Sequence, residues 1–524
     1  MNFRIKWITT IVFVVAAFVL LNSACNNHYH RNSLHPDIPI SSIREGESLA
    51  EIYCQSCHLF PDPALLDARS WENGVLPNMA PRLGIFSYDR RWYPSSLNDP
   101  NIGKEFYPSA PMLTQGQWKD LMNYYIATAP DSLPTQQRTT AIEPNLPLFQ
   151  AVIPTMHYEN PATCFIHVDS SAKNRSLFIC DAIRKNVVRL DDRLRPIDSI
   201  GIGGPVVDIH YDSSGMLACD IGRLNPNNGR FGKAIHIGLT QEGKMKRDSV
   251  ALLDSLARPV QITPVDLNLD GRLDYLICEF GNLKGALSWM ENKGNGKFVR
   301  HIIRPAPGAI KAYVQDYNHD GLPDLWVLFA QGEEGIFLYT NLGHGQFKEE
   351  EVLRFPPIYG SSYFELDDFN HDGFPDILYT CGDNADYSGV LKPYHGVYIF
   401  LNDGENHFSQ KYFFPIDGCY KAIARDFDGD GDLDIATIAF FADYAHQPEE
   451  GFVYLENKGD FHFQPYTLPQ AQLGRWLTMD VADLDGDGKP DIILGNFSVG
   501  PSITKPRIDW RKGPPFLFLK NMRK

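Results

Sequence analysis

From residue 150 to the C terminus, short apolar runs alternate with polar segments, and several runs directly follow an aspartate. Runs of this length, rich in Ile, Leu and Val and bounded by Gly, Asn and Asp, are typical of buried β-strands. The N-terminal part has a different pattern. Residues 42–53 have the spacing of a capped amphipathic helix, and a second helix begins near Thr114 and ends before Pro130. The pattern therefore predicts a small helical domain followed by a large β domain.

The first 24 residues predict an export signal. Arg4 and Lys6 precede an apolar stretch from Trp7 to Leu21. This stretch is short for a transmembrane anchor, which needs roughly 20 residues. The Ser-Ala-Cys25 sequence resembles a bacterial lipoprotein cleavage site, although Asn occupies the position where Leu is usual. The resemblance implies that Cys25 is lipidated and that the exported protein is anchored in the cell envelope. The expected location is the outer membrane of a Gram-negative bacterium, on its periplasmic or surface side.

A Cys-x-x-Cys-His motif follows the first predicted helix directly. Cys54, Cys57 and His58 form the attachment pattern for c-type haem, in which two thiols one helical turn apart reach both vinyl groups and the imidazole binds the iron. Export agrees with this interpretation, because c-type haem is attached outside the cytoplasm. Gly46 and Ala50, on the face that leads to Cys54, predict a close crossing with another helix.

The order of helix, motif, loop and helix over residues 42–130 resembles a class I cytochrome c domain, which implies one haem c. Two methionines are candidates for the sixth iron ligand, and a Met ligand suits an electron carrier because it closes the iron to substrates. Met79 is favoured over Met112, because exported cytochrome–propeller proteins that this chain resembles carry the same Leu-Pro-Asn-Met segment. If neither methionine binds, the iron is open or has two His ligands, and catalysis at the haem becomes possible.

Five segments of the β domain match the pattern D-x-[DN]-x-D-G-x-x-D. Ca²⁺ prefers six to eight oxygen ligands, and this spacing directs side-chain oxygens inwards at positions 1, 3, 5 and 9, with a glycine for the turn at position 6. Each ninth residue opens an apolar run rather than a helix, so the loops are predicted to be turns between strands. About five Ca²⁺ are expected, with the ligands Asp266, Asn268, Asp270, Asp274, Asp316, Asn318, Asp320, Asp324, Asp368, Asn370, Asp372, Asp376, Asp426, Asp428, Asp430, Asp434, Asp483, Asp485, Asp487 and Asp491.

The loops recur at intervals of 50, 52, 58 and 57 residues, and an Asn…Phe pair six residues apart recurs in register with them. Each interval has room for about four short strands, as in a propeller blade. Two degenerate copies without the loop, over 169–181 and 208–220, bring the predicted number of blades to seven. A strand within 516–519 is expected in the last blade, and residues near 148–153 are candidates to close the ring.

The loops and the blade spacing of residues 150–524 resemble the FG-GAP/VCBS repeats of integrin-type β-propellers, although the Phe-Gly and Gly-Ala-Pro letters are absent. The predicted fold is mainly β, a seven-bladed β-propeller with calcium loops, preceded by a small all-α cytochrome c domain. Residues 25–41 are predicted to be a tether, and residues 131–149 a linker.

Long polar segments between the strands of each blade are expected to surround one mouth of the propeller. Glu279, Asp383, Asp386 and His395 are the candidates for a general base or for contacts with a polar substrate. No nucleophile motif, phosphate-binding loop or zinc pattern accompanies them. Cys180, Cys219, Cys278 and Cys381 are each expected to end the first strand of a blade, and such equivalent positions suit small buried residues as well as disulfides. Cys164 and Cys419 complete the six remaining cysteines, and no pairing is predicted.

The chain of 524 residues carries 48 Lys and Arg against 64 Asp and Glu, a formal charge of −16. This acidity argues against nucleic acid as a partner. The predicted loops alone contain enough carboxylates to account for the excess, and five Ca²⁺ would reduce the charge to about −6. The favoured function is electron transfer to a redox partner protein, with the propeller as a binding platform. The alternatives are a haem-dependent periplasmic oxidoreductase of a small polar substrate, or an adhesion or assembly module.

Overall fold

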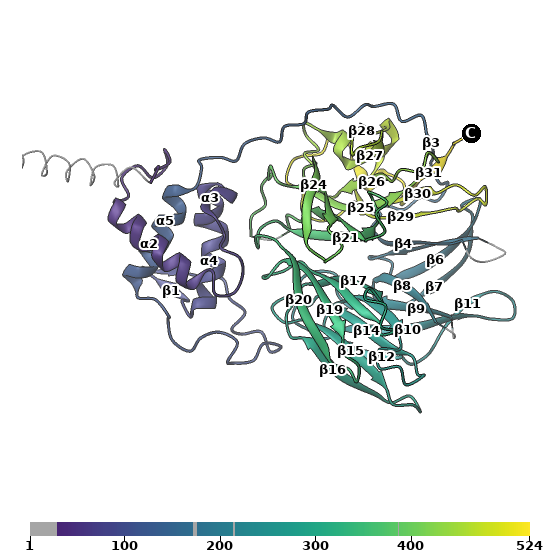
Figure 1. Ribbon diagram of the computed structural model, residues 1–524, viewed down its shortest axis with the longest axis horizontal. Coiled ribbons are helices and arrows are strands. Elements are labelled where there is room, and N and C mark those ends of the chain that lie inside the picture. Colours follow the sequence, from purple (N-terminus) through teal and green to yellow (C-terminus); the bar gives the residue numbers. More distant parts are fainter. Residues whose placement is uncertain (1–28, 171–174, 213–214, 386) are drawn as a thin grey trace, which may run out of the picture. The chain divides into compact units, whose positions relative to one another are not determined.

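The computed structural model describes residues 29–170, 175–212, 215–385 and 387–524 (Figure 1). The predicted signal peptide, Cys25 and Asp386 lie outside the described residues. The chain divides into two compact units. Residues up to Leu133 form the first, except Cys57–Leu59 and Asn98–Gly103, which group with Pro134–Lys524 in the second. Within the described part, no helix has the length and apolar character needed to cross a bilayer.

Two helices of 14 residues, α2 (Ile40–Tyr53) and α5 (Gln115–Thr128), dominate the first unit. Helix α2 crosses helix α5 at Gly46, where an added Cβ atom would lie 2.0 Å from the backbone oxygen of Asp120. The close crossing predicted from this glycine is therefore confirmed. The elements of the unit are α2 (Ile40–Tyr53), η1 (Pro63–Leu65), α3 (Ala68–Ser70), η2 (Trp71–Val75), α4 (Leu76–Met79), η3 (Ala80–Leu83), the hairpin β1 (Ser87–Tyr88) and β2 (Arg91–Trp92), and α5 (Gln115–Thr128).

The ends of these helices agree with the prediction in one case and differ in the other. Thr114 caps α5 in a capping box, since its hydroxyl accepts the Gln117 N–H and the Gln117 side chain accepts the Thr114 N–H. Helix α2, in contrast, begins at Ile40 after Pro39, with no side-chain cap. The capped start expected at residue 42 is wrong, because the Ser42 hydroxyl contacts the Asp120 side chain instead.

Part of the segment predicted to be a tether is packed. Asn32 is buried, and its side-chain amide donates to the carbonyls of Ile126 at 2.6 Å and Ala129 at 2.8 Å. These carbonyls belong to the C-terminal end of α5 and the residue that follows it, where backbone acceptors lack partners within the helix. Asn32 therefore fixes the chain to the end of α5, and residues 25–41 do not form a free tether over their whole length.

The second unit is a seven-bladed propeller, and seven blade sheets are present among the described residues. The first strands of successive blades adjoin one another and form the inner ring. The blades are β4–β7 (Thr163–Asp169, Ser176–Asp181, Asn186–Asp191, Pro196–Gly201), β8–β12 (Val206–Asp212, Gly215–Asp220, Gly232–Leu239, Met245–Arg247, Leu253–Leu256), β13–β16 (Pro259–Val265, Asp274–Glu279, Ala286–Asn292, Phe298–Arg304), β17–β20 (Ala309–Gln315, Asp324–Phe329, Gly335–Asn341, Phe347–Arg354), β21–β24 (Ser361–Asp367, Asp376–Cys381, Gly396–Asn402, Phe408–Pro415), β25–β28 (Cys419–Arg425, Asp434–Ala439, Phe452–Asn457, Phe463–Tyr466), and β29–β31 (Trp476–Ala482, Asp491–Asn496, Phe516–Asn521) with β3 (Phe149–Val152).

The two ends of the propeller sequence share one blade. Strand β3 pairs antiparallel with β31, with Phe149 opposite Asn521 and Val152 opposite Phe518. In Figure 1 the two strands lie side by side near the C terminus. The ring is therefore closed by the residues that the sequence indicated, and β31 is the third strand of the last blade.

The second strand of each blade with an acidic loop is completely buried, and so are those of the two degenerate blades apart from Gly215. Cys180, Cys219, Cys278 and Cys381 lie at or next to the ends of these second strands, not of the first strands as expected. The six cysteines of the described propeller are buried and form no disulfide. They act as small core residues.

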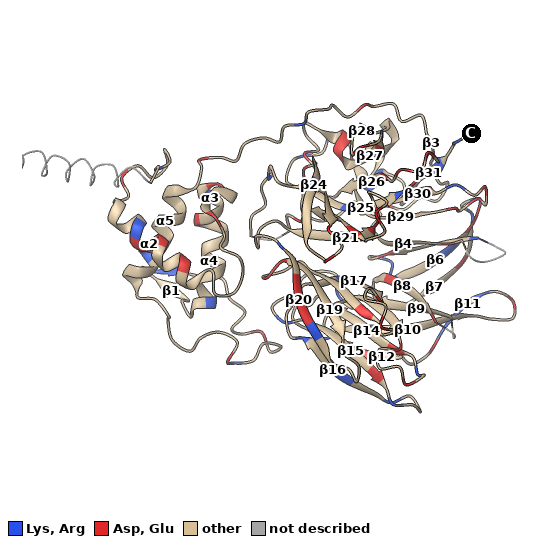
Figure 2. Ribbon diagram, viewed as in Figure 1, with Lys and Arg blue, Asp and Glu red and all other residues tan. Residues whose placement is uncertain are grey.

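Charged residues of both signs are interspersed over the propeller, with an acidic stretch along β20 (Figure 2). Glu349, Glu350 and Glu351 of this strand are exposed. The acidity of the chain is therefore not confined to the predicted metal loops.

Candidate calcium loops and haem-attachment motif

Each of the five acidic loops connects the first and second strands of its blade, and its ninth residue begins the second strand, as predicted. In the loop of the third blade, the Asp266 carboxylate accepts the N–H groups of Asp270 at 3.1 Å and Gly271 at 2.8 Å. The Asn268 side chain accepts the Asp270 N–H at 3.1 Å. The loops that begin at Asp316 and Asp368 repeat these bonds. Side-chain oxygens at positions 1 and 3 are thus held inside a closed turn.

In the last two loops, carboxylates converge. One oxygen from each of Asp426, Asp428 and Asp430 lies within 4.8 Å of the others, and Asp483, Asp485 and Asp491 are arranged in the same way. Like charges at this separation repel one another unless a cation or a proton lies between them. Lys520 contacts Asp485 and supplies one such cation. The donor set, hard oxygens in a compact loop, fits Ca²⁺.

The aspartate at position 9 has a different environment from the others. Asp274, Asp324, Asp376, Asp434 and Asp491 are fully buried. Burial raises the pKa of each, to about 7 for Asp434 and about 6 for Asp491. A bound divalent cation would offset this cost of burying a carboxylate, so the ninth aspartate also suits a metal ligand.

The Asn…Phe marker found in the sequence also has a structural role. Asn341 ends the third strand of its blade, and its N–H donates to Asp324 at 2.7 Å. Its side-chain amide donates to the carbonyls of Leu267, in the preceding blade, and Pro323. Asn521 makes the equivalent bonds to Asp491, Phe427 and Pro490. At Asn341 the marker therefore connects the ninth loop residue to the preceding blade, a role that the spacing alone did not reveal.

The Cys-x-x-Cys-His motif leaves the end of α2. Cys54 caps this helix through its N–H, which donates to the Ala50 carbonyl at 2.8 Å, and Cys57 is exposed. The Nδ1 atom of His58 lies 2.8 Å from the Leu59 carbonyl oxygen. Because a carbonyl only accepts, Nδ1 carries the proton and Nε2 is left as the donor for a metal. Burial lowers the pKa of His58, which favours the neutral imidazole that binds iron.

The two candidate distal methionines differ in exposure. Met79 ends helix α4 and is half-buried, whereas Met112 is 50% exposed. The N–H of Met112 donates to the Leu83 carbonyl at 2.9 Å, which ties it to the end of η3. A thioether that binds iron must be shielded from water, so the burial of Met79 agrees with the preference expressed from the sequence.

The candidate catalytic residues are not gathered at one place. Glu279 is fully buried at the end of β14, where it accepts the Ala257 N–H at 2.7 Å and the Ser288 hydroxyl at 2.7 Å and pairs with Arg300. Both oxygens of its carboxylate are therefore already bonded to groups of the protein. Asp383 follows β22 in a different blade and is half-buried. Burial raises the pKa of Tyr420, and the charge of Asp383 raises it further.

His395 is also fully buried, beside Lys392 and Asn384, which are buried as well. Burial lowers the pKa of His395, and Lys392 lowers it further. The Lys392 ammonium and the Asn384 amide have no hydrogen-bond partner in the described protein. These buried polar groups lie in the fifth blade, whereas Glu279 lies in the third.

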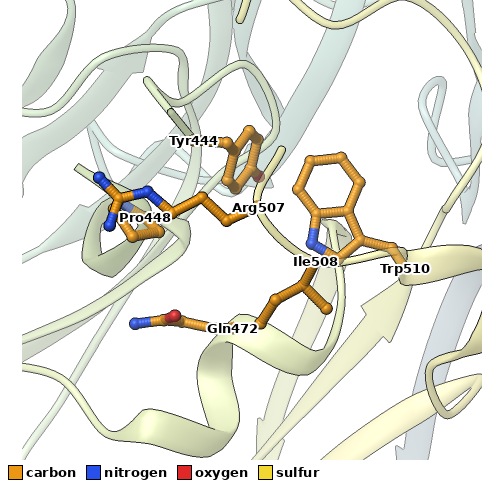
Figure 3. Close-up of a pocket in the computed structure, with 6 residues that line it drawn as sticks. All are labelled: Tyr444, Pro448, Gln472, Arg507, Ile508 and Trp510. Carbon is orange, nitrogen blue, oxygen red and sulfur yellow. The ribbon is translucent and has the colours of Figure 1, made fainter. Parts of the chain in front are cut away.

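The surface next to Tyr444 and Trp510 has a small hollow, lined also by Pro448, Gln472, Arg507 and Ile508 (Figure 3). Its volume is about 10 Å³, and a single water already needs roughly that much. The hollow therefore cannot accept a substrate. A larger cavity lies between the first two blades, which lack acidic loops.

Comparisons with known proteins agree with this architecture. A model of the FG-GAP-like repeat matches residues 266–327, 316–379 and 440–494. Integrin alpha-4 of Xenopus laevis is 31% identical over an alignment of 147 residues that covers 25% of this chain. The matched part is 14% of the length of that integrin.

Among solved structures, the chain is similar to BBS1N in complex with ARL6DN, at a TM-score of 0.44 and 9% identity over 73% of this chain and 98% of that chain. It is also similar to Saccharomyces cerevisiae Sqt1, at a TM-score of 0.41 and 8% identity over 70% of this chain and 98% of that one. The seven blades and the repeat matches together support an integrin-type β-propeller for the second unit.

Proposed function

We propose that this protein is an exported, lipid-anchored electron carrier in which one haem c is attached to Cys54 and Cys57. His58 is the proximal ligand and Met79 the distal ligand, with Met112 as the alternative. The propeller binds about five Ca²⁺ and serves as the platform for a redox partner or a substrate. The lipid anchor at Cys25 places the molecule in the cell envelope.

The observation that carries the proposal is the state of His58. Its Nδ1–H donates to the Leu59 carbonyl, so Nε2 is available, and its lowered pKa keeps the ring neutral. The motif also follows a helix whose crossing with α5 is fixed by Gly46. When bound, the haem supplies reversible one-electron chemistry. The protein residues hold the group in place, orient the imidazole and exclude water.

Export-competent expression of the full chain tests the attachment. Because thioether bonds survive denaturation, haem is expected to stay with the polypeptide on a denaturing gel, and Cys54→Ala/Cys57→Ala is expected to lose it. The matched control is Cys164→Ala/Cys180→Ala, which removes two thiols from the described propeller and is expected to retain the haem. A wild-type polypeptide without covalent haem would contradict the proposal.

A second function is favoured by the repeat matches. The propeller resembles a segment of an integrin α chain, so an adhesion or assembly module is the alternative, with the helical unit as an appendage. The double variant Cys54→Ala/Cys57→Ala separates the two functions. Unchanged attachment of cells to a surface or a partner favours adhesion. Loss of electron transfer to a soluble cytochrome acceptor in the same variant favours the carrier.

A further inference from the structure

A cavity lies between the first and second blades. Its volume is about 510 Å³, within the range of small-molecule sites. Its walls come from the turn after β5, the connection from β7 to β8, the segment between β9 and β10, and residues 247–254. None of the five acidic loops contributes to it. The cavity therefore lies in the two blades that have no acidic loop.

Glycines form one wall of this cavity. Gly203 has φ +105°, and an added Cβ at Gly204 would lie 2.0 Å from a carboxylate oxygen of Asp220. Asp220 is 4% exposed and accepts the Gly222 N–H at 2.8 Å. The absence of side chains at 203 and 204 thus lets a buried carboxylate reach the cavity wall. Such a carboxylate can accept hydrogen bonds from hydroxyl groups of a ligand.

The cavity is rich in positive charge although the chain is acidic. Three carboxylates also line it, from Asp220, Asp248 and Asp254. The cations that line it are Lys185, Arg223, Arg230, Lys233 and Arg247. A surplus of cations around a cavity attracts anions and repels cations.

Three of these cations already have partners in the protein. Arg230 lies 3.5 Å from Glu279, Lys233 lies 3.5 Å from Asp254, and the Arg223 guanidinium lies 4.0 Å above the Phe231 ring. Within the described residues, the side chains of Lys185 and Arg247 make no hydrogen bond and no ion pair within 4 Å, although the charge of Lys185 partly opposes the rise that burial causes in the pKa of Asp220. These two cations remain available to a ligand.

We propose that this cavity binds a small hydroxylated monocarboxylate, of the class of sugar acids. Lys185 and Arg247 bind its carboxylate, and Asp220 accepts hydrogen bonds from its hydroxyl groups. A phosphate ester is less suitable, because a dianion would be repelled by the three carboxylates in the same cavity. This inference names a ligand class for the binding platform and so rests on the proposed function.

Isothermal titration of the full chain with D-glucuronate tests the inference, with D-glucose and glucose 6-phosphate titrated in parallel. Glucuronate is expected to bind, with an affinity at least tenfold above that of either comparison compound. Arg247→Gln and Lys185→Gln are each expected to weaken glucuronate binding by about tenfold, the effect of losing one charge-assisted hydrogen bond. Added salt is expected to weaken it as well.

The matched control is Arg193→Gln, which removes an exposed cation that does not line the cavity. It is expected to leave the affinity unchanged. No binding of glucuronate, tighter binding of glucose 6-phosphate, or equal effects of all three variants would overturn the inference. Circular-dichroism melting curves verify that each variant is folded. Haem attachment is measured on the same preparations and does not depend on this cavity, so either failure can be identified separately.

Discussion

The helical unit and the propeller are stabilised by different means. In the helical unit, two helices cross at Gly46, and the elements between them are short helices and one two-stranded hairpin. The propeller instead repeats one four-stranded sheet, and five of its blades contain an acidic loop whose ninth residue is buried. The helical unit thus depends on one close helix crossing together with the apolar packing around it, and the propeller on a repeated local turn that is suited to a cation.

Because of this difference, we expect that each unit can be perturbed without the other. A change at the helix crossing is expected to leave the blades intact, and removal of the cations is expected to leave the helix crossing intact. Within the propeller, the first two blades have no acidic loop and serve as an internal reference for the other five. The following experiments test these separations.

Removal of Ca²⁺ is expected to have the largest effect. At a concentration 100 times Kd, each site stabilises the folded state by about 2.7 kcal/mol, so EDTA is expected to lower the propeller Tm by roughly 10 °C or more. Hydrogen exchange is expected to accelerate most in the five loop-bearing blades. Added Ca²⁺ restores both, whereas Mg²⁺ at the same concentration serves as the control. An unchanged Tm in EDTA would contradict the calcium assignment.

Gly46→Val tests the helical unit. The new side chain meets backbone oxygen and the Tyr124 Cβ on α5, so the helices must separate, at a cost of about 3 kcal/mol. Circular dichroism is expected to show an earlier helical melting transition with the propeller transition unchanged. Gly116→Val, in a helical position with nothing within 4 Å of an added Cβ, is the matched control. Equal destabilisation by both variants would show that the crossing is not the cause.

Asp417 gives the propeller a pH dependence outside the metal loops. Burial, with Asp443 nearby, raises its pKa to about 7. The folded state therefore binds the proton more tightly than the unfolded state, whose carboxyl has a pKa of about 4. Stability is expected to fall as the pH rises from 4 to 7, by up to about 4 kcal/mol, and to stay lower above pH 7.

Denaturant titrations of Asp417→Asn against pH measure this effect. The variant is expected to be the more stable protein at pH 8, and its stability is expected to change less between pH 4 and pH 8. Asp192→Asn, at an exposed position, controls for the loss of a charge. A parallel pH profile for the wild type and Asp417→Asn would refute the assignment.

The smallest effect concerns position 4 of the acidic loops. The last two loops have Gly429 and Gly486 there, with φ of +79° and +85°, whereas the first loop has Leu269 with φ +55°. A left-handed conformation costs a non-glycine residue about 1 kcal/mol or more. Gly429→Ala is therefore expected to destabilise its blade by about 1 kcal/mol, and Leu269→Gly to stabilise its blade by less. The change in the free energy of unfolding is measured for each variant by urea unfolding in Ca²⁺. Changes of the same sign for Gly429→Ala and Leu269→Gly would contradict this expectation.

Much of the fold could be predicted because its determinants are local. The acidic loops, the Asn…Phe marker and the apolar runs each lie within about ten residues, and they gave the number of blades and the closing strand near Phe149. The haem motif is equally local, since Cys54, Cys57 and His58 are almost consecutive.

The features that could not be predicted depend on residues far apart in the sequence. Glu279 looked like a surface carboxylate, but Ala257, Ser288 and Arg300 bury and satisfy it. The cavity between the first two blades combines residues from 185 to 254, which share no motif. Polar loops alone do not reveal which carboxylates point at the protein and which at solvent.

The most direct test of the central claim, a closed haem electron carrier, is the visible spectrum of the reduced protein with and without CO. With Met79 on the iron, a low-spin spectrum that CO does not change is expected, because both axial positions are occupied. Met79→Ala is expected to bind CO, and Met112→Ala is expected to behave as the wild type. Binding of CO to the wild-type protein would contradict the account.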